Sequence, residues 1–246
     1  MNSTRRQWLL GLSTVSAGTI LLSCNRGATS KSTQSQDEDQ EKGGPEVTAT
    51  EDLMREHGVL RRVLLVYSET ALKLRANPSV SIPAEPLQRA AKLFRAFGEE
   101  YHEKKLEEAY IFPAVKKVGG PAGGYADILT AQHQRGREIT DYILSITATS
   151  KIAASEINQF GGALESLVRM YEHHAAIEDT IVFPAWKQTL TEEQLDEMND
   201  KFEDIEHEQF GEDGFENAVK QIGEIEQSLN LADLNQFTAP APPAGK

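Results

Sequence analysis

Apolar residues recur at alternating spacings of three and four through most of the chain between about residues 50 and 229. This period is typical of amphipathic helices, and no strand-like alternation competes with it. The first helix is expected at about 50–76, and the run Gly119–Gly124 predicts a break before the third. The fourth is expected from Ile157 to Ala185. Four helices joined by short breaks predict an all-α fold, an up-down-up-down four-helix bundle.

Two further helices are expected after the bundle. One begins at Thr191, where Gln194 completes a capping-box pattern, and the other spans about residues 213–229. The chain is therefore expected to divide into five segments. These are a signal segment (1–24), a disordered polar linker (25–50), the helical bundle (51–190), a C-terminal helical extension (191–236) and a disordered tail (237–246).

The first 24 residues have the pattern of a targeting segment. Adjacent arginines, Arg5 and Arg6, precede an apolar run that suits a signal peptide and is short for a membrane-spanning helix. The arginine pair resembles a twin-arginine export signal, and the run LLSC ending at Cys24 resembles a bacterial lipobox. The resemblance implies an exported lipoprotein of the periplasm or cell envelope, anchored to the membrane at Cys24. An ordinary cleaved signal and an uncleaved anchor are the alternatives.

Charge and cysteine content narrow the range of partners. The formal net charge is −13, which argues against nucleic acid and against an anionic bilayer surface, since both repel a net anion. Cys24 is the only cysteine, so the chain can form no intramolecular disulfide.

A repeat within the helical region points to chemistry. The stretch YHEKKLEEAYIFPAV (101–115) aligns without a gap on the later stretch EHHAAIEDTIVFPAW (172–186). Each copy carries histidine, a pair of acids and then Phe-Pro-Ala. Histidines also lie on the inward stripes of the first and third helices, at His57 and His133. Burying several imidazoles and carboxylates costs several kcal/mol per ionised group unless a cation compensates them.

The expected metal ligands are histidines and glutamates on the inward faces of the four helices. Iron suits such imidazole and carboxylate donors in a bundle core, as does manganese. Two glutamates can bridge a pair of cations while histidines take terminal positions, which leaves coordination positions open. Glu108 and Asp179, each beside a ligand glutamate, are expected either to orient ligands or to face solvent. The proposed set is His57, His102, Glu107, His133, His174 and Glu178.

The two copies differ in how histidine and glutamate are spaced. His174 and Glu178 are four residues apart and share one helix face, whereas His173 falls off the stripe. His102 and Glu107 are five apart, about 140° around a regular helix. A π-bulge between His102 and Glu108 is therefore predicted, which would turn Lys105 outward. The alternative is that Glu103 supplies the ligand oxygen.

These residues resemble the signature of the hemerythrin-like family, whose helical bundles hold a non-heme di-iron centre. The match covers about residues 50–190 and is of the bacterial four-histidine, two-glutamate type. The resemblance implies two bound irons and dioxygen or nitric oxide as ligand, for oxygen binding, sensing or protection against stress. With no signalling domain attached, a sensor would need a separate redox or signalling partner.

Two other classes of function stay open. One is an oxidoreductase on the same site, such as a nitric oxide reductase, a peroxide-consuming protein or a ferroxidase, with Tyr67, Tyr101 or Tyr171 as candidate proton donors. The other is a metal-free helical interaction module. His207 lies after the fourth helix and is expected to pack against the bundle rather than to bind metal.

Overall fold

The computed structural model describes residues 47–77, 80–149 and 151–243. The signal segment, Cys24 and nearly all of the expected linker lie outside these residues. Within them the chain is helical and contains no strand, as the apolar period predicts. None of the helices in the described ranges is both long and apolar enough to cross a membrane.

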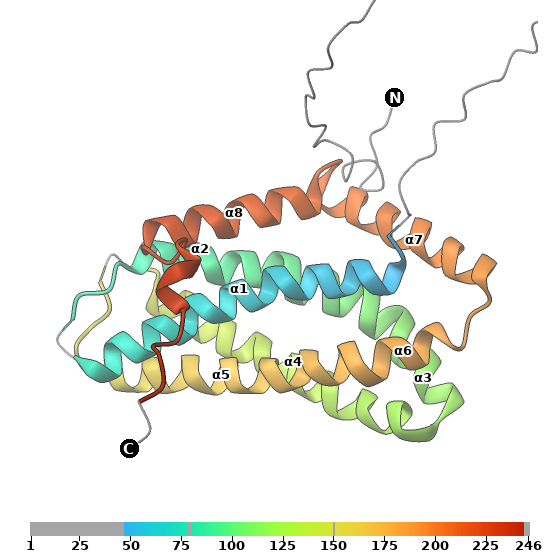
Figure 1. Ribbon diagram of the computed structural model, residues 1–246, viewed down its shortest axis with the longest axis horizontal. Coiled ribbons are helices and arrows are strands. Elements are labelled where there is room, and N and C mark those ends of the chain that lie inside the picture. Colours follow the sequence, from blue (N-terminus) through green and yellow to red (C-terminus); the bar gives the residue numbers. More distant parts are fainter. Residues whose placement is uncertain (1–46, 78–79, 150, 244–246) are drawn as a thin grey trace, which may run out of the picture. The chain divides into compact units, whose positions relative to one another are not determined.

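Four antiparallel rods form the bundle (Figure 1). The first is α1 (Ala49–Ala76), and the third is α4 (Gly120–Ile146). The second joins α2 (Ala84–Leu93), the π-helical segment η2 (Phe94–Ile111) and α3 (Phe112–Val118). The fourth joins α5 (Ile157–Ile177), the π-helical segment η3 (Glu178–Val182) and α6 (Phe183–Lys187). This confirms the predicted four-helix bundle.

The first helix begins slightly earlier than expected. Thr48 caps α1 with a capping box, in which its hydroxyl and the Glu51 carboxylate each accept a backbone N–H. Ala49 and Thr50 are helical and buried, although they fall in the segment expected to be linker. A small apolar residue and a capping threonine carry little apolar signal, so the stripe alone located the start only to within a few residues.

The glycine-rich break is shorter than predicted. Only Gly119 and Gly120 leave the right-handed helical region, with φ of 79° and 70°. Pro121 then lies in the first turn of α4, where its missing N–H costs nothing, and the rest of the run is helical. A Cβ added at Gly123 would lie 2.8 Å from the carbonyl oxygen of Val115. Gly119 and Gly120 therefore make the turn, whereas Gly123 allows α3 and α4 to approach closely.

Two helices of the C-terminal extension pack on the bundle (Figure 1). α7 (Glu192–Phe210) begins at Thr191 with the predicted capping box to Gln194, and α8 covers Gly214–Ser228. Arg62 of α1 donates to both carboxylate oxygens of Glu226 on α8. A short 3-10 turn, η4 (Leu234–Phe237), follows. The extension thus adds a further layer over α1 and α2.

Candidate metal centre

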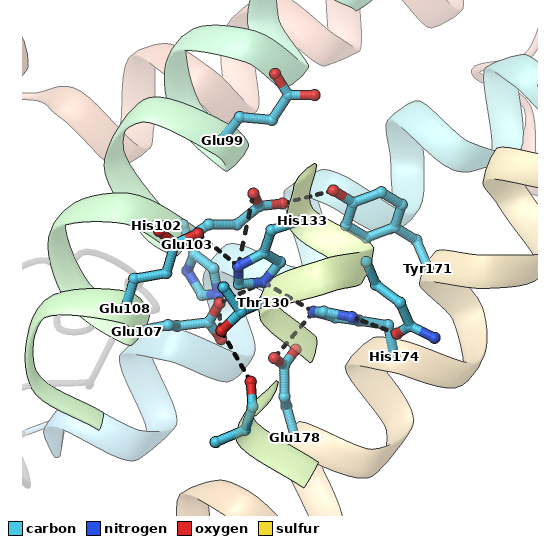
Figure 2. Close-up of polar contacts among 12 residues, drawn as sticks. Glu99, His102, Glu103, Glu107, Glu108, Thr130, His133, Tyr171, His174 and Glu178 are labelled. Carbon is cyan, nitrogen blue, oxygen red and sulfur yellow. Dashed lines mark hydrogen bonds and ion pairs between the residues drawn. The ribbon is translucent and has the colours of Figure 1, made fainter. Parts of the chain in front are cut away.

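The structure brings all six predicted ligand side chains together inside the bundle. Figure 2 shows five of them, His102, Glu107, His133, His174 and Glu178. Each of the six is at most 3 % exposed, so none faces solvent. α1 and α4 each supply one histidine, and the second and fourth rods each supply a histidine and a glutamate. Ligand atoms of Glu107, His133, His174 and Glu178 lie within 4.8 Å of one another, as do those of His57, His102 and Glu107.

The imidazoles form two pairs that face each other through Nε2. His57 and His102 are 3.0 Å apart between these atoms, and so are His133 and His174. For two ligands at right angles around a cation about 2.1 Å from each nitrogen, the separation would be about 3.0 Å. The spacing within each pair therefore fits two ligands on one ion.

The two glutamates lie between the histidine pairs. Glu107 places Oε1 3.3 Å from His102 Nε2 and Oε2 3.3 Å from His133 Nε2. Glu178 places Oε1 2.9 Å from His174 Nε2 and Oε2 3.5 Å from His57 Nε2. Each carboxylate thus turns one oxygen toward each pair, which is the arrangement that bridging two cations requires.

Each histidine is oriented by a hydrogen bond at its other nitrogen. Nδ1 of His57 lies 2.7 Å from Asp179, and Nδ1 of His133 lies 2.9 Å from Glu108. An ionised carboxylate can only accept, so Nδ1 carries a proton and Nε2 is the nitrogen that faces inward, where its lone pair could bind a cation once Nε2 is deprotonated. Of the two readings open for these acids, the structure supports ligand orientation. Arg61 pairs with Asp179 in turn.

The remaining two orienting groups were missed by the sequence analysis. Glu56 accepts from His102 Nδ1 at 2.7 Å and from the hydroxyl of Tyr101 at 2.9 Å. Gln132 Oε1 accepts from His174 Nδ1 at 2.9 Å. Each immediately precedes one ligand histidine and bonds to a ligand histidine of another helix. The matching pairs Glu56-His57 and Gln132-His133 were the signal that could have revealed them.

The predicted distortion in the second rod is confirmed and is broader than a single bulge. Hydrogen bonding is π-helical throughout η2, which brings Glu107 under His102 despite their spacing of five residues. Lys105 turns away, and its Nζ donates to Gln209 on α7. Glu103 instead accepts from the Tyr171 hydroxyl at 2.7 Å and from Arg137 at 3.1 Å. The geometry therefore favours Glu107 over Glu103 as the ligand of this rod.

A second π-helical turn occurs in the fourth rod, which the sequence did not indicate. The N–H of Phe112 donates to the carbonyl of Glu107, and the N–H of Phe183 donates to that of Glu178, each five residues back. A proline follows both phenylalanines. Because proline has no N–H and its ring crowds the carbonyl four residues back, a widened turn accommodates it. The shared Phe-Pro step thus accompanies the same distortion beneath both candidate bridging glutamates.

The protein alone compensates the two carboxylates unequally. Among the described residues, no hydrogen-bond donor is placed on either oxygen of Glu107 or of Glu178, although all four are buried. Burial raises the pKa of Glu178 well above its usual range, and repulsion from Glu107 adds to this. For Glu107, burial acts in the same direction, but His102 and His133 outweigh it and hold the pKa well below its usual range. Ionising the buried Glu178 is therefore costly in the protein alone, and a cation beside it would offset that cost.

The pKa values of His174 and His133 are shifted in opposite directions. Burial lowers the pKa of His174 to about 3, with a further contribution from repulsion by His133. Burial also opposes protonation of His133, but Glu103, Glu107 and Glu108 together raise its pKa to about 10. Without cations, protons must therefore balance the carboxylates, and cation binding would release them.

A narrow pocket opens over the site. Its free interior has room for roughly one molecule of the size of water. Leu60, Leu64 and Ala175 form apolar parts of its wall, while Glu103 and Tyr171 contribute a polar part. Five of the six predicted ligands also line it, all except His133.

The other histidines and tyrosines take different roles. His173 is exposed, as its position off the stripe predicts. His207 lies on α7 outside the cluster, and it is exposed rather than packed against the bundle, so that expectation is wrong. Of the three candidate tyrosines, Tyr171 alone lines the pocket. The hydroxyl of Tyr101 donates to Glu56, whereas that of Tyr67 is buried with no partner placed among the described residues.

Comparison with known proteins agrees with this arrangement. A sequence model of the hemerythrin HHE cation binding domain matches residues 48–186, and a second match covers residues 125–238. The chain belongs to this family. Uncharacterized proteins of Mycobacterium bovis and of two strains of Mycobacterium tuberculosis are each 39 % identical over 234 residues. These matches cover 95 % of this chain and 90 % of each relative. No solved structure gives a significant match.

Proposed function

We propose that the protein is a non-heme di-iron protein that binds dioxygen or nitric oxide, for oxygen binding, sensing or protection against oxidative and nitrosative stress. Membership of a cation-binding family supports a metal site, and the donor set supports iron, with manganese as the alternative. The observation that carries the proposal is the pair of buried glutamates, each turning its two oxygens toward different histidine pairs.

The division of labour among the residues follows from this geometry. His57 and His102 would hold one iron and His133 and His174 the other, with Glu107 and Glu178 bridging. The bound irons would supply open coordination positions for a small ligand. The orienting hydrogen bonds at Nδ1 keep the imidazoles in place, and the surrounding apolar side chains exclude bulk water.

The size and lining of the pocket support a small ligand. The small free space beside the candidate ligands favours a small ligand over a larger organic substrate. Leu60, Leu64 and Ala175 offer no hydrogen bond to it, so a weakly polar ligand loses little on leaving water.

Metal analysis of the purified chain with optical spectra, before and after addition of dioxygen or nitric oxide, tests the proposal. About two irons per chain and a reversible, oxygen-dependent charge-transfer band are expected. Glu178→Ala should lose the metal pair, whereas Glu172→Ala, an exposed position on the same helix, should keep it. A chain that takes up neither iron nor manganese would refute the proposal, and it would favour a metal-free interaction module. Retention of both irons by Glu178→Ala would contradict the bridging role.

A second candidate, a di-iron oxidoreductase, has its own support in the pocket wall. Reduction of nitric oxide or peroxide takes electrons from an external reductant and consumes protons, and Tyr171, Glu103 and Arg137 form a hydrogen-bonded group beside the site. Sustained consumption of either compound over many turnovers would select this function. Reversible binding without consumption would select the ligand-binding function.

We further propose export and lipid anchoring at Cys24, which would tether the site to the membrane of the cell envelope. The lipobox-like sequence supports this assignment. Incorporation of labelled fatty acid into the wild type, and not into Cys24→Ala, is expected; equal incorporation into both would refute anchoring there. A sensing role would need a separate redox or signalling partner.

A further inference from the structure

The orienting contacts around the site repeat as the ligands do. Glu56, His57 and Arg61 of α1 correspond, in order and in spacing, to Gln132, His133 and Arg137 of α4. In both halves the arginine pairs with the acid that orients the histidine of its own helix. Arg61 pairs with Asp179, and Arg137 donates to Glu108 at 2.6 Å. The two halves therefore share one plan beyond the six candidate ligands.

The two halves differ in residue charge at one orienting position. Glu56 and Gln132 occupy equivalent places and make equivalent bonds, at 2.7 Å to His102 and at 2.9 Å to His174. One acceptor is an anion that is 1 % exposed, and the other is a neutral amide. A carboxylate makes the stronger bond to an imidazole N–H and raises the basicity of the other ring nitrogen more. His102 is therefore the better electron donor toward a cation.

A further carboxylate, Glu103, lies on the opposite half but does not orient a histidine. Its Oε2 lies 3.9 Å from Nδ1 of His133, beyond hydrogen-bond distance. Its oxygens accept instead from Arg137 and from the Tyr171 hydroxyl, so Glu103 does not replace the orienting bond that Glu56 makes.

We propose that the two metal positions are unequal: the position at His57 and His102 binds its cation more tightly, and the position at His133 and His174 fills second and empties first. The cause is that position 132 holds glutamine, whereas the equivalent position 56 holds glutamate. This inference rests on the proposed function, because it requires that both positions take a cation.

Calorimetric titration of the metal-free full chain with Mn²⁺, which resists oxidation by air, tests the inference. Two binding steps are expected, separated by about 10–100-fold in affinity, the usual effect of an orienting partner. Two adjacent cations repel each other, so two equal positions would also give two separate binding steps. The comparison of variants with the wild type is therefore what tests the inference. Gln132→Glu should tighten the weaker step by about 10–100-fold, and Glu56→Gln should weaken the tighter step by a similar factor.

Gln134→Glu is the matched control, because it adds the same charge to an exposed position of the same helix. It should leave both steps within about twofold of the wild type if exposed charge is screened. Should Glu56→Gln unfold the chain, as judged by circular dichroism, Gln132→Glu tests the inference independently. Two bound cations with steps that neither variant moves more than Gln134→Glu does would overturn this inference alone. A wild-type chain that binds no cation would overturn the proposed function with it.

Discussion

Gly136 of α4 packs closely against Tyr171 of α5 beside the site. A Cβ added at Gly136 would lie 2.0 Å from the Tyr171 hydroxyl oxygen and 2.8 Å from two of its ring carbons. The tyrosine has little freedom to withdraw. Its hydroxyl donates to Glu103 at 2.7 Å, and its ring packs edge-on against Phe94, with centroids 5.0 Å apart. Gly136→Ala should therefore displace Tyr171 and break its hydrogen bond.

The expected cost can be assembled from three terms. Overpacking of a well-packed core costs about 1–3 kcal/mol. Loss of a buried hydrogen bond to a charged acceptor costs about 1.5–3 kcal/mol. Alanine regains about 0.5–1 kcal/mol over glycine within a helix. Gly136→Ala should therefore lower the free energy of unfolding by about 2–5 kcal/mol.

Urea denaturation followed by circular dichroism, at a fixed metal content, measures this loss. Gly162→Ala is the matched control, because nothing lies within 4 Å of a Cβ at this position of α5. It should stabilise the protein by about 0.5–1 kcal/mol. The double variant Gly136→Ala/Tyr171→Phe lacks the hydroxyl that makes the shortest contact, so it should recover part of the loss. If Gly136→Ala proves as stable as Gly162→Ala, the close approach does not constrain the core.

Three further predictions concern pH and the extension. Burial raises the pKa of Glu99 to about 7, against 4.5 for an ordinary glutamate, so its contribution to stability is present below about pH 4.5 and is lost as the pH rises to 7. Glu99→Gln should exceed the wild type in unfolding free energy by up to about 3 kcal/mol at pH 8, with a gain that shrinks toward pH 5; an equal gain at both would contradict the titration. Glu206 accepts from the N–H of Phe215 in the first turn of α8, so Glu206→Ala should cost about 1–2 kcal/mol in the urea assay, and the exposed Glu208→Ala close to nothing. Because ligand histidines must be deprotonated, competition with a chelator should remove metal faster and more completely as the pH falls from 7.5 to about 5, and pH-independent retention would count against imidazole ligation.

The apolar period carried most of the information about the fold. Stripes of apolar residues at three- and four-residue spacings located the helices, and the capping box at Thr191 located the start of α7. The predicted break over the glycine run was too long. In sequence, a glycine that permits close packing cannot be told from one that permits a turn. Gly123, which is helical and faces the carbonyl of Val115, belongs to the first kind.

The predicted ligands came from residue type and position on a stripe, whereas the groups that orient them lie across helix boundaries. Glu56 and Gln132 each bond to a histidine of a different helix, so no local period encodes the contact. The constant offset between the matching residues of α1 and α4 was nevertheless present in the sequence, and it would have placed both residues at equivalent positions.

The second and fourth rods show why an ungapped comparison could not pair the histidines correctly. It aligns His102 with His173, yet the side chain that shares the site with Glu178 is His174. The two glutamates align without a gap, whereas the two inward histidines are offset by one position. The reason is that the π-helical hydrogen bonding of η2 takes one more residue than α5 to pass from histidine to glutamate. Two copies of a repeat can therefore place equivalent side chains in one site although their spacing in sequence differs by one residue. Here the additional residue lies in the widened π-helical turn that places Glu107 among the histidines.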